Sequence, residues 1–378
     1  MRKVGRPSRM WIAGAIYALM LLVGIAIPTA YIVQSPGPVL DVTGEIDGEE
    51  ILEISGLPTS ESETDFLMTT VTATGNADHG VPGVVAASAV FSRNLQLVPV
   101  RALYPREVTS AEIRERNLSL MDFSQDTAAA VAFETAGLDV AMTLSIARVP
   151  DESPAAGKLQ EGDVLKAISS AADGTNGVEF VPIETFKDLS GVLDATPEGT
   201  EVSLKIEREG QEKTVSVVTE GFEPDVTGWV HPGSKLGVFV QVTDVELPAE
   251  VEYVVDNIGG PSAGMIFALT IYDAVTEGSL GGDSTIAGTG AIAWDGEIDS
   301  IGGIRHKINA AADAGATDFI APAPNCPETA GFEPDGLNIW AVRTIDEAID
   351  VVESIETGDT SGLTPCSAIE LVEPLGTN

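Results

Sequence analysis

The stretch Gly259-Gly260-Pro261-Ser262-Ala263-Gly264 leads directly into MIFALTIYDAV, residues 265–275. Small residues surround Ser262, so no large side chain screens its hydroxyl. The residues after it recur at helical spacing, which predicts a helix over 262–275 with Ser262 at or near its N-cap. Free backbone N–H groups at such a helix start can stabilise the oxyanion that forms when a serine attacks a carbonyl group. Serine is also a common N-cap, so this stretch alone does not establish a nucleophile.

A nucleophilic serine needs a base. The segment Gly302-Gly303-Ile304-Arg305-His306-Lys307 opens a second predicted helix, in which Arg305 and Lys307 flank the inward stripe almost equally and His306 points away. Arginine stays protonated in proteins, whereas a desolvated lysine can lose its proton. We therefore predict that Lys307 is the base. A serine–histidine hydrolase that uses His79 or His231 is the alternative, although both histidines lie in predicted loops.

Three motifs between residues 237 and 355 resemble, in order, those of the proteolytic domain of the Lon family of serine–lysine peptidases. Gly260–Gly264 resembles the nucleophile motif, and Ile301–Lys307 resembles the motif that bears the lysine. Between them, Ala287–Ile292 followed by Asp295-Gly296 resembles a hairpin whose threonine lies near the dyad.

The resemblance implies that Ser262 is the nucleophile, that Lys307 is the general base and that Thr289 supports them. It implies no metal and no cofactor. Gly259 departs from the family pattern, since many Lon members have an acidic residue there. The sequence has no Gly-x-x-x-x-Gly-Lys-(Ser/Thr) phosphate loop, because Gly157-Lys158 is followed by leucine. We therefore expect an ATP-independent serine endopeptidase.

Residues 131–220 resemble a PDZ domain. The resemblance rests on Ser153-Pro154-Ala155 followed by Gly162-Asp163, and on a predicted hairpin around Glu209-Gly210. It implies that an extended peptide adds as a strand, held by a preceding loop. The matching loop is Gly137, Leu138, Asp139 and Val140, in which Asp139 replaces a usual glycine and would repel a peptide carboxylate.

Strands and helices alternate over residues 228–355, which predicts an α/β (α+β) Lon-type domain. Residues 34–130 contain strand-like runs, a helix start at Thr109 and an alanine-rich helix over 124–133. If this segment belongs to the protease fold, the PDZ-like domain is inserted within it; otherwise the domains follow one another. Residues 356–378 form a tail rich in glycine, threonine and serine.

The N-terminus predicts a membrane anchor. Residues 1–9 carry four basic residues, and residues 10–33 then run without a charge, which is long enough for a transmembrane helix. The preceding positive charges place residues 1–9 in the cytoplasm and the remainder outside the cell. A cleaved signal peptide is the alternative. In that compartment Cys326 and Cys366 form a candidate disulfide.

The net charge of −38 makes nucleic-acid binding unfavourable. The whole chain resembles the membrane-anchored, PDZ-containing Lon-like proteases of Gram-positive bacteria. This resemblance implies protein or peptide substrates that are membrane-anchored or secreted. Lon-type domains tend to form rings, so the resemblance is compatible with a homo-oligomer. The rival function is a non-catalytic PDZ adaptor on a Lon-like scaffold.

Overall fold

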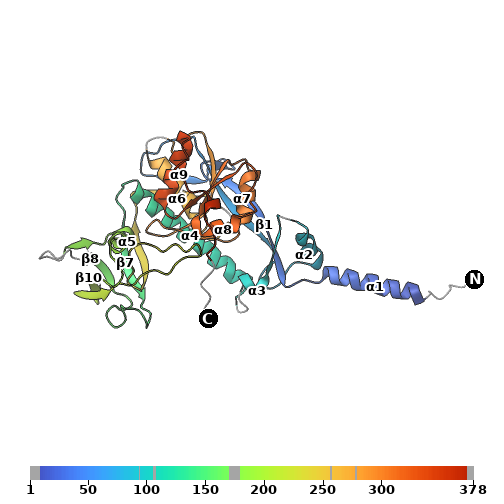
Figure 1. The fold of residues 1–378 in the computed structure, drawn as a ribbon, viewed down its shortest axis with the longest axis horizontal. Coiled ribbons are helices and arrows are strands. Elements are labelled where there is room, and N and C mark those ends of the chain that lie inside the picture. The colour runs from blue at the N-terminus through green and yellow to red at the C-terminus, as the bar shows by residue number, and fades with distance from the viewer. Residues whose placement is uncertain are drawn as a thin grey trace, which may run out of the picture.

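The computed structural model describes residues 9–92, 94–104, 108–169, 179–255, 258–276 and 279–372. A central domain lies between a smaller β-rich domain and a projecting N-terminal helix (Figure 1). The central domain contains a mixed sheet of six strands in the order β18-β17-β14-β5-β1-β6. Its strands are β1 (Tyr31–Asp41), β5 (Asp65–Thr74), β6 (Gln96–Pro99), β14 (Thr285–Gly288), β17 (Asp318–Pro322) and β18 (Asn338–Val342).

The connectivity of this sheet settles the place of the N-terminal segment. Strands β5, β14, β17 and β18 pair in parallel, although more than 200 residues separate β5 from its neighbour β14. Strand β1 pairs antiparallel with both β5 and β6. Residues 34–130 therefore belong to the same domain as the nucleophile motif, and the β-rich domain is inserted between its two parts.

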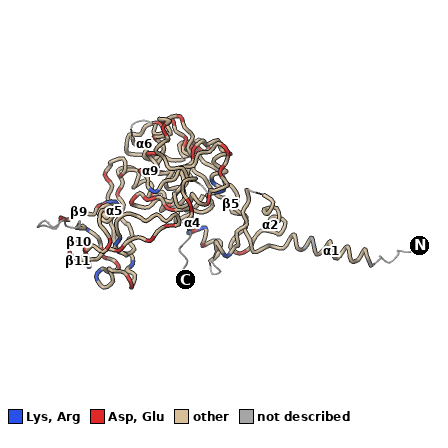
Figure 2. The backbone as a smooth tube through the Cα atoms, in the orientation of Figure 1, with Lys and Arg blue, Asp and Glu red and all other residues tan. Residues whose placement is uncertain are grey.

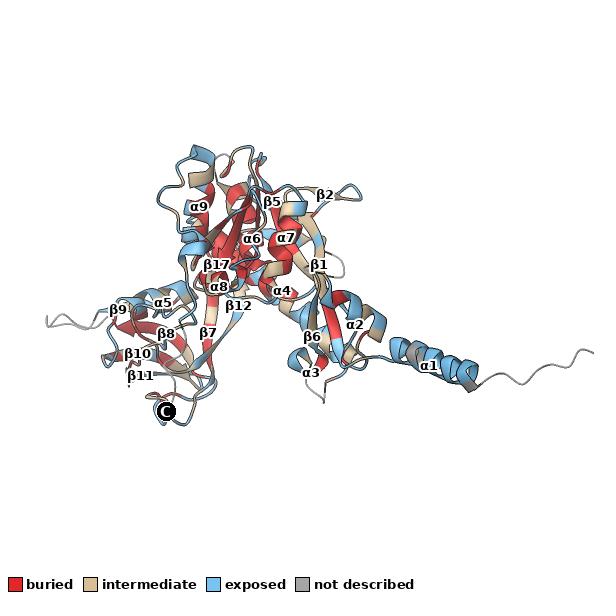
Figure 3. Ribbon diagram, turned by 45° about the vertical axis from the view of Figure 1, so that its right-hand side comes forward, coloured by how far each residue is buried: buried red, intermediate tan, exposed pale blue. Residues whose placement is uncertain are grey.

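Side chains alternate along the strands, so apolar residues point to both faces of the sheet, and helices cover both faces. Phe66 and Ile320 point to the face covered by α4 (Ser110–Thr135), α6 (Gly264–Val275) and α9 (Ile345–Thr357). Leu67 and Phe319 point to the opposite face, which α7 (Ile304–Asp313) covers. The buried strands lie between these helices (Figure 3).

Helix α4 is longer than the sequence predicts. Thr109 caps it as expected, because its side chain and that of Glu112 satisfy each other's backbone N–H groups in a capping box. The helix then continues without interruption to Thr135, so the predicted alanine-rich helix is its second half. Five consecutive residues of that half, Ala128–Ala132, are buried, and their small side chains allow close packing against α6.

The smaller domain has a sheet in the order β11-β10-β8-β7-β12, with β9 beside β8. The predicted hairpin at Glu209-Gly210 is present, with both turn residues at positive φ. One boundary was wrong: residues 239–242, assigned to the protease domain, belong to β12, which pairs with β7. The domain comprises β7 (Ala141–Arg148), β8 (Val164–Ser169), β9 (Phe180–Pro182), α5 (Phe186–Asp194), β10 (Glu201–Arg208), β11 (Gln211–Val218) and β12 (Phe239–Glu246).

The predicted anchor segment, residues 10–33, is not a single helix. Helix α1 covers Arg9–Ala26, and β1 begins at Tyr31, so that Ile32 and Val33 are buried in the central domain. These two residues are apolar because they pack in a protein core. Among the residues that the structure describes, no helix combines the length and the hydrophobicity that a membrane crossing requires.

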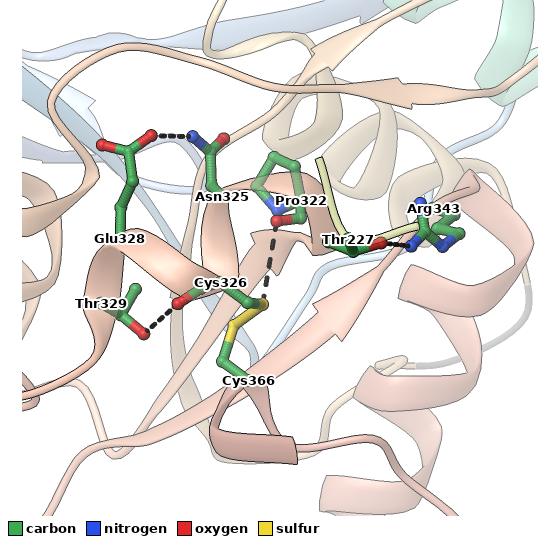
Figure 4. Close-up of a disulfide and its surroundings, with 8 residues drawn as sticks. All are labelled: Thr227, Pro322, Asn325, Cys326, Glu328, Thr329, Arg343 and Cys366. Carbon is green, nitrogen blue, oxygen red and sulfur yellow. Dashed lines mark hydrogen bonds between the residues drawn. A yellow bond between two sulfur atoms is a disulfide. The ribbon is translucent and has the colours of Figure 1, made fainter. Parts of the chain in front are cut away.

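The C-terminal tail is tied to the central domain. Cys326 and Cys366 form a disulfide, and both cysteines are buried (Figure 4). Their partners in this core include Ile304 and Ile308 of α7. The remaining short elements are β2 (Glu45–Ile46), β3 (Glu49–Glu50), β4 (Leu52–Ser55), α2 (Gly83–Val90), α3 (Val100–Leu103), β13 (Glu250–Tyr253), β15 (Ala291–Ile292), β16 (Ile298–Asp299) and α8 (Cys326–Thr329).

Candidate active site

Ser262 lies in the turn that enters α6, one residue before the N-cap, which is Ala263. The turn is held against α4 by two hydrogen bonds. The N–H of Gly260 donates to the carbonyl oxygen of Asn117 at 2.8 Å, and the Ser124 hydroxyl donates to that of Pro261 at 3.0 Å. Gly260 has φ 97°, a conformation that favours glycine. The second glycine of the motif is therefore required by the turn that presents Ser262.

Three side chains from separate elements meet at this turn. The Nζ of Lys307 lies 2.7 Å from the Oγ of Ser262 and 2.8 Å from the Oγ1 of Thr289. The Thr289 hydroxyl donates to the carbonyl oxygen of Ser262 at 2.9 Å. Ser262 comes from the start of α6, Thr289 follows β14, and Lys307 lies in the first turn of α7. The structure thus brings together the three residues that the motifs singled out.

The environment of Lys307 favours its neutral form. The residue is 2% exposed, and burial lowers the pKa of its amine to about 7. The ambiguity between the two cations of the motif is also resolved. Arg305 points elsewhere, since its guanidinium donates to the carbonyl oxygen of Glu328 and lies over the ring of Phe332.

His306 differs from the prediction that it points away from the protein interior. It is 3% exposed, and its Nε2 has no hydrogen-bond partner within the described ranges. Burial is the main reason that its pKa is lowered. The short helix α7 packs against strands β1 and β5 of the sheet and also against α8, so a single inward stripe does not describe it.

A tight hairpin fixes the backbone around Ser262. The N–H of Gly290 donates to the carbonyl oxygen of Ser262 at 3.0 Å, and the N–H of Met265 donates to that of Gly290 at 3.1 Å. A Cβ atom on Gly290 would lie 2.5 Å from the side chain of Ile298, so the close approach requires glycine. The glycines around Thr289 therefore serve packing, and Thr289 itself serves the contacts with Ser262 and Lys307.

Ser262 and Lys307 line a cleft of about 470 Å³. Ser262 is partly exposed there, while Thr289 and Lys307 are buried. Within the part of the chain that the structure describes, the N–H of Ala263 beside Ser262 has no acceptor. The lining combines apolar side chains with strand residues of β5: Pro38, Met68, Thr69, Thr70, Val71, Thr72, Met121, Ile258, Gly259, Ser262, Ala263, Gly302 and Lys307.

The histidine alternative finds no geometric support. His79 is exposed in a loop and does not line the cleft. His231 lies in the other domain, where its Nε2 contacts the carboxylate of Glu297 and its Nδ1 lies 2.6 Å from the carbonyl oxygen of Pro232. Neither ring is a hydrogen-bond partner of Ser262 among the described residues.

A second and larger cavity, of about 540 Å³, lies where the two domains meet. Its walls in the smaller domain are α5 and the edge strand β12, together with the loop 234–238 that precedes this strand. Residues 295–297 and 343–347 of the central domain form another wall, and Phe222, Trp229, His231 and Pro232 also line the cavity. We call this cavity the inter-domain groove. Leu189, Leu193 and Leu236 give it an apolar floor.

The loop predicted to bind a peptide, Gly137 to Val140, does not line this groove. The N–H groups of Gly137 and Leu138 donate to the carbonyl oxygens of Glu134 and Phe133, which ends α4 in a Schellman arrangement. Gly137 has φ 75°, so its glycine serves the helix stop. The loop that lines the groove is instead residues 234–238, which contain Leu236-Gly237-Val238 and follow the PDZ-like motif in the sequence.

The rim of the groove carries charged and aromatic side chains from both domains. The Arg343 guanidinium donates to Asp225 at 2.7 Å and lies over the ring of Trp229. Across the junction, His231 contacts Glu297. Burial, reinforced by the nearby carboxylate of Asp295, raises the pKa of Glu297 to about 7. These contacts join the groove directly to the hairpin that carries Thr289.

Comparison with known proteins agrees with the geometry of the site. Residues 255–354 match the family model of the Lon protease (S16) C-terminal proteolytic domain. This chain is 38% identical over 95 residues to Lon protease 2 of Bacillus subtilis, which is 25% of this chain and 17% of that protein. It is 28% identical over 117 residues to the archaeal Lon protease of Methanocaldococcus jannaschii, which is 31% of this chain and 17% of that protein.

These matches cover a third of the chain or less, and this chain spans less than a fifth of the length of these curated relatives. The segment at residues 255–354 is similar to a serine peptidase domain. Among solved structures, the PDZ domain of an SdrC-like protein from Listeria innocua matches with 16% identity and a TM-score of 0.19. The match covers 26% of this chain and 92% of that structure.

Proposed function

We propose that this protein is a serine endopeptidase that works through a Ser262–Lys307 dyad. The observation that carries the proposal is the 2.7 Å contact between a partly exposed Ser262 hydroxyl and a buried amine whose pKa lies near 7. A lysine in this environment supplies a neutral base close to physiological pH. The match of residues 255–354 to a peptidase domain supports the same reaction class.

The reaction follows from the positions of the three residues. The Ser262 Oγ attacks the carbonyl carbon of the scissile peptide bond, and the Lys307 amine takes the hydroxyl proton. The oxyanion lies beside the unpaired N–H of Ala263 at the start of α6. Lys307 then gives its proton to the leaving amine as the C–N bond breaks. A water molecule, activated by the same amine, hydrolyses the acyl-enzyme and restores Ser262.

Thr289 positions the base. Its hydroxyl accepts from Lys307 and donates to the backbone of Ser262, so it holds the amine at the serine while leaving a lone pair of the neutral amine for the Ser262 proton. A threonine-to-valine change keeps the shape and removes these contacts. We expect Thr289→Val to lower kcat by about 10- to 100-fold, since it misplaces the base without removing it.

The test of the dyad measures hydrolysis of an unstructured protein such as casein. We expect Ser262→Ala and Lys307→Ala each to abolish turnover, and a phosphonate probe to label the intact enzyme at Ser262. Arg305→Ala is the matched control, because it removes a cation from the same helix that lies outside the cleft. Turnover in either dyad variant at the level of the intact enzyme would exclude the mechanism.

We further propose that the inter-domain groove engages substrate as an extended strand. The open edge of β12 offers backbone groups for strand addition, and the leucines of the floor offer an apolar surface. Gly191 lines the groove on α5, and a Cβ added there meets no atom within 4 Å. Gly191→Trp should therefore fill the groove without disturbing the fold.

In the same casein assay, Gly191→Trp should raise KM while leaving cleavage of a short fluorogenic peptide unchanged. Glu184→Trp, an exposed position outside the groove, is the control. If Ser262→Ala abolishes casein cleavage and Gly191→Trp leaves KM for casein unchanged, the proposed enzyme is supported and the groove proposal is excluded. If Gly191→Trp removes the cellular phenotype of the protein and Ser262→Ala leaves it intact, the non-catalytic adaptor is favoured.

The location and the energy source are also proposals. We propose that α1 anchors the enzyme to a membrane, that residues 27–378 lie outside the cell and that its substrates are membrane-anchored or secreted proteins. The buried disulfide supports an oxidising compartment, and the absence of a phosphate loop in the sequence supports hydrolysis without ATP. Protease protection in whole cells and casein cleavage with and without ATP test these two points.

A further inference from the structure

Asn325 is a buried amide whose hydrogen bonds reach the loop before α7. It follows β17 in a short turn of 3-10 helix and is 2% exposed. The N–H of Ile301 donates to its Oδ1 at 2.8 Å, and its Nδ2 donates to the carbonyl oxygen of Ile301 at 2.9 Å. One side chain thus pairs with both backbone groups of a residue 24 positions earlier in the chain, as a neighbouring strand would.

The Asn325 amide is itself held in place. Its Nδ2 also donates to the Oε1 of Glu328 at 3.2 Å (Figure 4). An asparagine side chain has one acceptor oxygen and two donor hydrogens, so all its hydrogen-bonding groups have partners here. A rotation of this side chain would leave buried polar groups unpaired, which is unfavourable. Asn325 therefore holds Ile301 in one orientation.

These bonds also fix the peptide group that joins Ile301 to Gly302. In a trans peptide the C=O and the N–H point in opposite directions. Because the Ile301 carbonyl group points to Asn325, the N–H of Gly302 points away from it. Among the described residues, none accepts a hydrogen bond from this N–H. Gly302 lines the cleft that contains Ser262 and Lys307, and a Cβ added to Gly302 would meet no atom within 4 Å.

The cleft has little charge with which to hold a substrate. Acidic residues are spread over the central and the smaller domain (Figure 2), yet Lys307 is the one charged residue in the lining of the cleft, as far as the structure describes it. Its amine already contacts Ser262 and Thr289. A polypeptide in this cleft is therefore held largely through its backbone. Unpaired N–H groups of the enzyme are the donors that match its carbonyl oxygens.

We propose that the N–H of Gly302 donates to a backbone carbonyl oxygen of the bound substrate, and that Asn325 is the positioning residue that orients this N–H. The inference rests on the proposed endopeptidase function and adds a substrate contact to the same cleft. The N–H of Ala263 lies beside the nucleophile and faces the scissile carbonyl group, whereas Gly302 serves another carbonyl group of the same polypeptide. A contact with the backbone does not depend on the substrate's side chains.

The experiment compares KM for an extended fluorogenic peptide between the intact full chain and Asn325→Asp. An ionised aspartate has the shape of asparagine, but it repels the carbonyl oxygen of Ile301 in place of donating to it. We expect KM to rise by about 3- to 10-fold at about pH 8.5, with kcat changed less than KM. At about pH 6 the buried carboxyl group is protonated and donates again, so the ratio of the two KM values should return toward one.

Two further variants separate the lost hydrogen bond from the added charge. Asn325→Ala cannot donate at any pH, so its KM should stay raised at both pH values. Asn309→Asp adds the same charge to α7, at an amide that donates to the carbonyl oxygen of Arg305 and does not line the cleft. Its KM should equal that of the intact enzyme. The charged groups near Asn325, namely Glu328 and the Arg305 that donates to the Glu328 backbone, are the same in all these proteins.

Two measurements do not depend on turnover. Hydrogen exchange, followed by mass spectrometry, should be faster around Ile301 in Asn325→Ala than in the intact protein, because the N–H loses its acceptor. The rate at which a phosphonate without a peptide arm labels Ser262 should be unchanged in Asn325→Asp. Slower labelling would mean that Asn325 supports the dyad and not Gly302, and would overturn the proposal.

Unchanged exchange, or faster exchange with unchanged KM, would also overturn the proposal and leave the dyad intact. Turnover in Ser262→Ala would instead exclude the proposed function, whatever the exchange shows. If circular dichroism shows that Asn325→Asp is unfolded, Gly302→Val replaces it, since its side chain enters open space in the cleft. An unchanged KM in Gly302→Val would show that substrate does not pass this position.

Discussion

At the scale of single residues, the proposed chemistry depends on the Lys307 amine. A buried ammonium without a carboxylate partner is unfavourable, and burial accordingly lowers the pKa of Lys307 to about 7. Only the neutral amine can accept the Ser262 proton, so activity follows its deprotonation. We predict that kcat/KM rises about tenfold per pH unit below this pKa and levels off above it.

The measurement is a profile of kcat/KM for a peptide substrate from about pH 5.5 to about pH 8.5. Circular dichroism at each pH checks that the protein stays folded. A profile that is flat across the acidic half of this range would exclude Lys307 as the titrating base. If kcat/KM falls above neutral pH, the reaction requires a protonated Lys307 instead.

The same burial makes a prediction about stability. The folded-state pKa lies below the ordinary lysine value of 10.5, so the unfolded chain binds more protons between about pH 7 and about pH 10.5. The destabilisation from burying the amine is therefore full below pH 7 and decreases as pH rises. Lys307→Met removes the titrating group and keeps the side-chain length.

We expect Lys307→Met to be inactive and more stable than the intact enzyme at pH 7. Its advantage in the free energy of unfolding should shrink by on the order of 2 kcal/mol between about pH 7 and about pH 9. Urea denaturation at both pH values measures this. An advantage that does not change with pH would mean that the amine is charged in the folded protein.

Gly259 shows at the scale of elements why this chain departs from the Lon pattern. Helix α4 passes so close that a Cβ on Gly259 would lie 2.9 Å from the Cβ of Asn117 and 3.2 Å from its carbonyl carbon. Any side chain, acidic or not, would push the turn that carries Ser262 away from α4. The departure is therefore a consequence of packing between α4 and this turn.

We predict that Gly259→Ala lowers kcat/KM at least tenfold, because a shift of a few tenths of an ångström misplaces Ser262 relative to Lys307. The free energy of unfolding should fall by only about 1–3 kcal/mol, as for other overpacked sites. Gly362→Ala is the control, since a Cβ there meets no atom within 4 Å. If kcat/KM is unchanged in Gly259→Ala, α4 moves aside without displacing Ser262 from Lys307.

The disulfide acts at the scale of the whole molecule, because it ties the tail to the helix layer that carries Lys307. Cys326 and Cys366 close a loop of 40 residues and pack with Ile304 and Ile308 of α7. In the chain-entropy description such a loop stabilises the folded state by about 4 kcal/mol. Replacing both cysteines with alanine should therefore lower the denaturant midpoint clearly.

The intact protein treated with a reductant in denaturant should show the same lower midpoint, which separates loss of the bond from loss of the sulfur atoms. Activity well below the midpoint should be retained, since neither cysteine lines the cleft. Equal midpoints for the oxidised, reduced and double-alanine proteins would mean that the tail contributes nothing to stability.

The sequence by itself predicted the three residues that meet at the candidate site, because its motifs are local. Glycines that set a turn, a serine before a helix and a lysine one turn into another helix are encoded by adjacent residues, and so is the hairpin at Glu209-Gly210. Strand and helix periodicity likewise indicated the α/β class.

Long-range packing decided the rest. Only the fold brings Thr289 to Lys307, places β5 beside β14 and moves β12 into the sheet of the other domain, because these pairings join residues far apart in the chain. The apolar residues 32–33 similarly could not be assigned from hydropathy, since membrane and protein core select the same side chains. The place of Gly137 was undecided for a similar reason: a glycine is compatible with both a helix stop and a loop, and only its backbone partners show that it ends α4.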